Sequence, residues 1–319
     1  MSDAPKLIVS HAPFLHGGGS IVVRNGQVLL ALIPAAICGM LRWGVPALAV
    51  IALSVSSAMA WELIFNRISR RPVTIGDGNA ASLGLVLALV LPATVPWWMV
   101  VAGTFLAVVI GKEIYGGIGA NPFNPVVVSV AILGISWKGY MDFDAMLLTY
   151  DPGFVMMEPL TAAKAFGTEA VARFSAFDLL MGRQAGAIGA PFGFWLIVGG
   201  IYLVACGVVR WEIPASFLAA VALVAAAFHL SNPQLYAGPM FHLLTGYTLI
   251  GAFFLAPEDS GSPVNFWPML IYGGAGGLMT VLIRNIGAYP DGVIYAVLVI
   301  NLINPLVDKI RPKALGRAA

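Results

Sequence analysis

The chain has 319 residues, of which 59% are hydrophobic and only 10% charged, and a soluble domain of this length cannot bury so apolar a composition. The sequence therefore excludes a water-soluble enzyme and predicts an integral membrane protein surrounded by lipid. The formal net charge of +2 is too small to indicate a nucleic-acid partner. The first 20 residues lack the pattern of a cleaved signal peptide, so the first apolar run is expected to be a true span.

Ten apolar stretches follow one another along the chain, most of them close to the length of a transmembrane helix. The stretches cover residues 22–41, 45–65, 79–95, 97–112, 122–137, 192–209, 213–230, 239–256, 265–284 and 290–307. The third to fifth are short and interrupted by prolines, which predicts helices that break or re-enter the membrane. The long polar stretch after the fifth span covers residues 138–191.

The basic residues predict how these spans are oriented. With the N-terminus inside, the inner segments collect most of the Lys and Arg residues, while the short outer loops contain only Arg42 and Arg284. Positive charge favours the cytoplasmic side of a membrane. Both termini are therefore expected in the cytoplasm and residues 138–191 outside.

An internal repeat is visible in the sequence itself. The run Arg-Trp-Gly-Val-Pro at 42–46 returns 168 residues later as Arg-Trp-Glu-Ile-Pro, and Ile-Gly-Ala-Asn-Pro at 118–122 returns at the same offset as Ile-Gly-Ala-Tyr-Pro. Two matches at one offset indicate a duplication. Because each half has five spans, an odd number, the second half is expected to be inverted relative to the first.

This duplication predicts the organisation of the whole chain. Residues 1–137 form the first five-helix repeat, residues 138–191 an outer, periplasmic loop, and residues 192–319 the second repeat with a cytoplasmic tail. In such folds, binding sites lie near the midplane between the repeats, where broken helices expose backbone groups.

The inner candidate site contains Asp77, Lys112, Asn121 and Asn124. Asn121 either caps the fifth span, or its amide and the positive end of the helix hold an anion or an electron-rich ring. Lys112 either belongs to this site or extends to the cytoplasmic surface.

The outer candidate site contains His242, Thr245, Thr248 and Asp291, together with Arg284. Asp291 is either a cap of the tenth span or a functional group, and His242 is either a satisfied hydrogen-bonding residue or a ligand or proton carrier. The two cysteines, at positions 38 and 206, are isolated, so neither a metal site nor a disulfide is expected. No residue of the chain is assigned a catalytic role.

Several motifs together carry a resemblance to the RnfD family, the D subunits of the Rnf electron-transport complex, which are related to the B subunit of the sodium-pumping NADH:quinone reductase. The similarity runs from about residue 10 to residue 312, and its most specific motifs are Asn-Pro-Phe-Asn-Pro at 121–125 and Tyr-Pro-Asp-Gly at 289–292. The other matching runs are 77–80, 91–101, 111–119, 210–214, 242–246 and 251–254.

The resemblance implies a fold similar to urea and ammonium channels and a flavin cofactor, riboflavin or FMN, in a bacterial inner membrane. It also implies the A, B, C, E and G subunits as partners, through which electrons pass between ferredoxin and NAD while Na⁺ or H⁺ crosses the membrane. We therefore expect an oxidoreductase subunit that binds flavin.

The sequence departs from the family at one functional position. The family attaches one FMN through a phosphoester to a Thr in the pattern Ser-x-Ala-Thr-Pro-Leu, whereas residues 155–160 read Val-Met-Met-Glu-Pro-Leu. Glu158 stands in place of that Thr, and a carboxylate cannot form a stable phosphoester. We therefore expect noncovalent flavin, with attachment at the nearby Thr161 as the alternative. The competing functions are a channel for a small polar solute, which the fold permits, and a scaffold that has lost its flavin.

Overall fold

The computed structural model describes residues 20–143 and 157–310, and the regular structure in these two ranges is helical. Five helical stretches are long and apolar enough to cross a membrane. They are α1 (Ile21–Trp43), α2 (Val45–Ile68), the stretch Trp97–Tyr115, α10 (Glu212–Ser231) and α13 (Phe266–Asn285). The third stretch consists of α4 (Trp97–Phe105), the π-helical η2 (Leu106–Ile110) and η3 (Glu113–Tyr115). These helices agree with the predicted all-helical membrane protein.

The remaining predicted spans contain shorter helices. They are α3 (Asn79–Val90), α5 (Pro125–Ser136), α9 (Gly193–Ala205), α14 (Val293–Val307), and α11 (Pro239–Leu244) followed by α12 (Thr248–Ile250) and the π-helical η6 (Gly251–Leu255). A helix of 12 residues, such as α3, rises only about 18 Å, against a hydrocarbon layer of roughly 30 Å. The count of ten spans therefore stays a prediction.

The end of α3 shows how a broken helix satisfies its backbone. Pro92 stops the helix, and the carbonyl groups of Leu89 and Leu91 accept hydrogen bonds from the amides of residues 188–190. The carbonyl of Val90 accepts a hydrogen bond from the Tyr247 hydroxyl at 2.8 Å. Because an unpaired backbone group is costly in an apolar surrounding, these bonds tie the segment before α9 to the end of α3.

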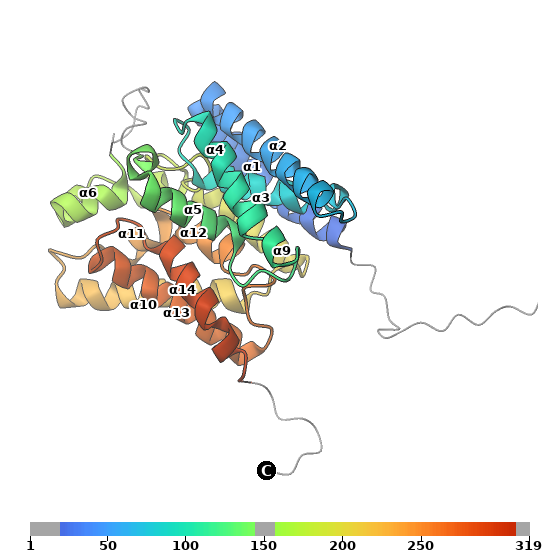
Figure 1. Ribbon diagram of the computed structural model, residues 1–319. Helices are drawn as coiled ribbons and strands as arrows, with labels where there is room; N and C mark the ends of the chain where they lie inside the picture. The colour runs from blue at the N-terminus through green and yellow to red at the C-terminus, as the bar shows by residue number, and fades with distance from the viewer. Residues whose placement is uncertain (1–19, 144–156, 311–319) are drawn as a thin grey trace, which may run out of the picture.

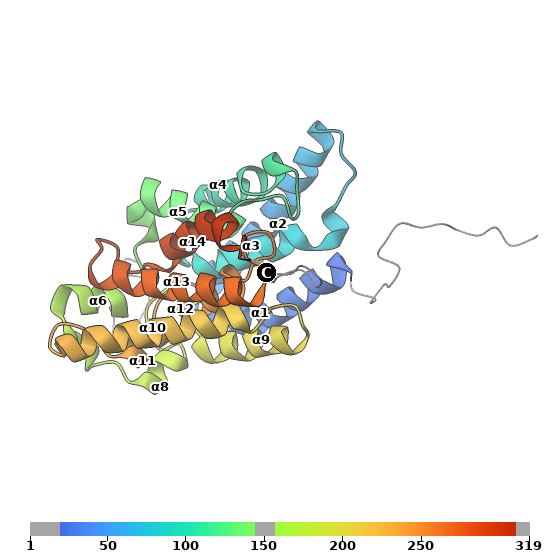
Figure 2. The ribbon, with the colours of Figure 1, turned by 90° about the horizontal axis from the view of Figure 1, so that it is seen from below.

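The polar segment between the halves adds short elements at one end of the molecule. They are η4 (Lys138–Met141), α6 (Pro159–Phe166), α7 (Thr168–Val171) and α8 (Ala176–Leu180). A small apolar cluster of Leu160, Leu179, Ala237 and Phe241 joins α6 and α8 to α11. In both ribbon views α6 lies at the same end of the molecule as the loop between α10 and α11 (Figure 1, Figure 2).

The helices of the two halves are packed against each other. Figure 1 shows α1, α2 and α4 on one side and α10, α13 and α14 on the other, with α5 and α12 between them. Across this boundary α1 contacts α9, and α5 contacts α14. Gly199 of α9 approaches the backbone of α1 so closely that an added Cβ would lie 2.3 Å from the Ala31 carbonyl oxygen. The core is therefore shared by both halves.

Candidate functional site

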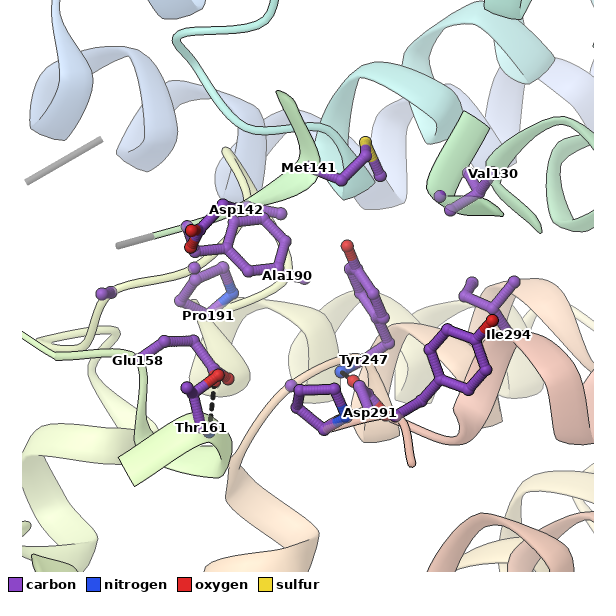
Figure 3. Close-up of a pocket in the computed structure, with 18 of the residues that line it drawn as sticks. Val130, Met141, Asp142, Glu158, Thr161, Ala190, Pro191, Tyr247, Asp291 and Ile294 are labelled. Atoms are coloured by element: carbon purple, nitrogen blue, oxygen red, sulfur yellow. Dashed lines mark hydrogen bonds between the residues drawn. The ribbon is translucent and has the colours of Figure 1, made fainter. Parts of the chain in front are cut away.

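A cavity of about 510 Å³ lies between the halves, at the end of the molecule that carries α6 (Figure 3). Its walls come from α5, η4 and the two residues after it, the start of α6, the segment before α9, the break between α11 and α12, and the turn before α14 with the first residues of that helix. The volume lies in the range of roughly 300–1,000 Å³ that is typical of cofactor and small-molecule sites. The side chains that give this outer cavity its polar character are Lys138, Asp142, Glu158, Thr161, Gln184, Tyr247, Tyr289, Asp291 and Tyr295.

Arg284 connects the predicted outer residues. Its guanidinium lies 2.9 Å from Asp291 Oδ1 and donates a 2.9 Å hydrogen bond to the Thr248 hydroxyl. It also donates to the backbone carbonyls of His242 and Thr245, at 2.8 and 3.2 Å. These carbonyls lie where α11 breaks, so a buried cation stabilises the negative end of that helix. The structure thus brings His242, Thr245, Thr248 and Asp291 together, as predicted.

The side chains of Asp291 and His242 differ in the number of their hydrogen bonds. Asp291 accepts hydrogen bonds from the amides of Val293, at the start of α14, and of Tyr247, which agrees with a capping role. The His242 side chain is buried, and its two ring nitrogens have no hydrogen-bond partner within residues 20–143 and 157–310. The role of His242 as a ligand or proton carrier therefore stays a prediction.

Gly246 allows the backbone to turn at the break between α11 and α12. Its φ is +64°, and an added Cβ would lie 2.2 Å from Asp291 Oδ2. Gly78, which lies 168 residues earlier and precedes α3, has a φ of +72°. Positive φ is a conformation that favours glycine. The two glycines therefore add a third correspondence at the offset of the predicted repeat.

Glu158 faces the outer cavity from the N-terminus of α6. Its Oε2 atom accepts a 2.5 Å hydrogen bond from the Thr161 amide, so the carboxylate caps the helix (Figure 3). Ser, Thr, Asp and Asn are the usual residues at such a position, and the longer Glu side chain reaches the same amide. Val155 and Met156 of the departing pattern lie outside the described residues.

The surroundings of Glu158 change its acidity. The side chain is only 6% exposed, and this burial raises the pKa of Glu158 from 4.5 to about 7. Hydrogen bonds from Thr161 oppose the shift, while the negative charge of Asp291 adds to it. Lys164, on the same helix, donates to the backbone carbonyls of Arg284, Gly287 and Tyr289 and so fixes α6 to the turn after α13.

The inner predicted residues surround a buried ion cluster. Lys112 is 2% exposed, and its Nζ atom lies 3.1 Å from oxygens of Glu62, Glu113 and Asn79. The alternative that Lys112 extends to the surface is therefore wrong. Asp77, in η1 (Ile75–Asp77), makes no hydrogen bond to Lys112; its Oδ1 atom accepts from the backbone amide of Asn79, whose side chain belongs to the cluster.

Asn121 and Asn124 connect the two halves. Asn124, and not Asn121, caps α5: its Oδ1 accepts from the amides of Val126 and Val127. Its Nδ2 donates to the Leu255 carbonyl of η6. The Nδ2 of Asn121 donates to Glu258 Oε1 at 3.1 Å. The cavity beside Asn121, Asn124 and Lys112 measures about 120 Å³, which is below the usual size of a cofactor site.

Two acidic residues, the buried Glu62 and the half-buried Glu258, were missed by the sequence interpretation. Glu62 interrupts the apolar second span, and ionisable residues in such spans usually have a function, so its position alone was a usable signal. Glu258 lies in a loop after the eighth span, where no sequence pattern distinguishes it. Only the fold brings Glu258 to Asn121, 137 positions earlier in the chain.

The broken helices, the buried ion clusters and the cavity between the halves are those of a multi-pass membrane protein with an internal cavity. The profile of the NQR2, RnfD, RnfE family matches residues 8–316, and the chain therefore belongs to this family, as the sequence motifs predicted.

Curated relatives are similar over nearly their whole length. The D subunit of the Na⁺-translocating ferredoxin:NAD⁺ oxidoreductase complex of Acetobacterium woodii is 34% identical, over 95% of this chain and 93% of the relative. The D subunit of the proton-translocating ferredoxin:NAD⁺ oxidoreductase complex of Clostridium ljungdahlii is 32% identical, over 94% and 93%. The D subunit of the ion-translocating oxidoreductase complex of Cronobacter sakazakii is 33% identical, over 97% and 98%.

Proposed function

We propose that this chain is the flavin-binding D subunit of a membrane complex that transfers electrons between ferredoxin and NAD and moves Na⁺ or H⁺. Membership of the family over residues 8–316, and relatives named as the D subunits of such oxidoreductases, support this function. The proposed partners are the A, B, C, E and G subunits of an Rnf complex. Ferredoxin and NAD bind to those partners.

The outer cavity is the observation that carries the flavin proposal. Its volume of about 510 Å³ accommodates a cofactor, and its wall contains the rings of Tyr247, Tyr289, Tyr295 and Phe143. Tyr289 and Tyr295 lie with their ring centroids 4.4 Å apart, and Phe143 packs edge-on against Tyr247. Such rings favour a flat aromatic ligand. A bound flavin supplies the electron-accepting and electron-donating group.

Covalent attachment of FMN does not fit this cavity. The family's attachment position holds the carboxylate of Glu158, which is bonded to the Thr161 amide. The proposed flavin is therefore noncovalent. From the sequence, this noncovalent flavin is expected between the halves, near the midplane or inner mouth, with polar contacts from Asn121 and Asn124. That site stays a prediction, and a flavin there needs a wider cavity than the 120 Å³ beside these residues.

The finer membrane arrangement is part of the same proposal. Ten spans form two inverted repeats, similar to urea and ammonium channels, in a bacterial inner membrane. Both termini are cytoplasmic and residues 138–191 are periplasmic. The Lys and Arg distribution and the matched positive-φ glycines, Gly78 and Gly246, support this arrangement.

A visible absorption spectrum of the purified full-length chain tests the function, because a flavin band excludes both the channel and the scaffold.

Gly134→Leu tests the cavity. Gly134 lines the cavity, and the atom nearest to an added Cβ at this position is the Tyr295 hydroxyl oxygen, 3.6 Å away. We expect this variant to lose flavin. Gly274→Leu is the matched control, because Gly274 of α13 has open space around an added Cβ. Full flavin in both variants would contradict the assigned cavity.

A further inference from the structure

The charge of the outer cavity is unusual for a site of an anionic cofactor. Three carboxyl side chains line it, those of Asp142, Glu158 and Asp291, and Lys138 is the one basic residue among the described lining residues. Two cations lie nearby. Arg284 pairs with Asp291 and binds the end of α11, and Lys164 binds three backbone carbonyls. Apart from the Arg284–Asp291 pair, the described lining therefore carries two carboxyl groups, those of Asp142 and Glu158, against the one ammonium of Lys138.

Glu158 occupies the place where a phosphate would find its donors. The N-terminus of a helix attracts anions because its first amides are unpaired. In α6, the Glu158 carboxylate already accepts from the Thr161 amide. A phosphate monoester carries about −1.5 to −2 charges near pH 7, and at this position it would meet a like charge in a poorly solvated site. Above pH 7, where Glu158 is ionised, its carboxylate thus acts as a built-in anion that excludes another.

The rest of the cavity suits an uncharged flavin. The tyrosine rings provide apolar surface for the isoalloxazine system, and carboxylate oxygens accept hydrogen bonds from hydroxyl groups. The hydroxyl-rich ribityl chain of riboflavin supplies such donors. In Figure 3, Glu158, Thr161 and Asp142 lie on one side of the cavity and Tyr247, Asp291 and Ile294 on the other, so a ring and a polar chain can be bound at different walls.

We infer that the outer cavity selects riboflavin and rejects FMN, and that Glu158 is the residue that determines this specificity. The inference rests on the proposed flavin function and names the form of flavin that this cavity accepts. A family position for attaching a phosphorylated flavin has become, in this chain, a position that excludes the phosphate.

Titration of the flavin-free full-length chain with riboflavin and with FMN, followed by flavin fluorescence at pH 8, tests the inference. We expect riboflavin to bind at least tenfold more tightly than FMN. Glu158→Gln removes the charge but keeps an oxygen for the Thr161 amide, and should tighten FMN binding at least fivefold while changing riboflavin binding less than twofold. Glu169→Gln, at an exposed site on α7, is the control and should change neither.

Three results would overturn the inference: equal or tighter binding of FMN by the unchanged chain, no change in the ratio of affinities in Glu158→Gln, or binding of neither flavin. Asp142→Asn provides a second variant should Glu158→Gln unfold, and it should also favour FMN. The flavin content of the intact complex is measured separately. If the complex contains flavin but the isolated chain shows no preference for riboflavin, only the inference fails. If the complex contains no flavin, the proposed function fails.

Discussion

Replacing Glu158 by Gln should change how the stability of the protein depends on pH. Burial raises the pKa of Glu158 from 4.5 to about 7, so between these values the folded chain binds a proton that the unfolded chain releases. The free energy of unfolding therefore falls as pH rises from about 4.5 to about 7 and then levels off. At about 1.36 kcal/mol per pKa unit, the loss from this group is about 3 kcal/mol.

Reversible unfolding of the full-length chain in mixed micelles, followed at several pH values, measures this effect. The titratable groups that act on Glu158 or lie beside it are Asp291, just before α14, Tyr247 from the break before α12, and Asp142 on the same side of the cavity. These groups are unchanged in the Glu158→Gln variant, so the difference between the two pH profiles isolates Glu158. We expect Glu158→Gln to be the more stable chain above pH 7 and to lose the advantage below pH 5. Parallel profiles would refute the assignment of a buried, proton-binding carboxyl.

Three further predictions concern stability, flavin binding and topology. Arg284→Met should lower the free energy of unfolding by about 3–5 kcal/mol, because it removes the buried cation that pairs with Asp291 and with the carbonyls at the end of α11. Arg24→Met breaks an ion pair whose side chains are 43% and 51% exposed, and it should lower the free energy of unfolding by about 1 kcal/mol or less. Equal losses in the two variants would contradict the burial argument. Asn124→Leu should lower the free energy of unfolding by about 1–3 kcal/mol, because the cap of α5 is lost. If the variant keeps its full flavin content, flavin does not bind at the inner site. Cysteines introduced at positions 70 and 169 should react with an impermeant reagent from outside only at 169, and the reverse pattern would exclude the proposed orientation.

Much of the fold could be predicted because membrane helices have a strong sequence signal. Long apolar runs located α1, α2, α10 and α13, since a helix satisfies the polar groups of its backbone within its own segment, as lipid requires. The broken elements were harder. Prolines indicated that α3 would stop early, but the partners of its free carbonyls, residues 188–190 and Tyr247, come from distant parts of the chain. Only the folded structure reveals such partners.

The sequence predicted which residues belong to the candidate site better than it predicted their hydrogen bonds. The residues that Arg284 joins were all named from the sequence, because charged groups stand out in apolar spans. The cap of α5 was assigned to Asn121 instead of Asn124, since the motif offers two Asn-Pro pairs and either can start a helix. The outer cavity itself had no sequence signal, because its wall combines residues from both halves and from the segment between them.

Acid denaturation of the purified full-length chain tests the central claim most directly, because it separates bound flavin from attached flavin. The chain is precipitated, and flavin is measured both in the supernatant and by fluorescence of the chain on a denaturing gel. We predict flavin in the supernatant, in an amount comparable to that of the chain, and a dark protein band. No flavin in either fraction, or a fluorescent band that disappears in Thr161→Ala, would contradict a protein that binds its flavin without a covalent bond.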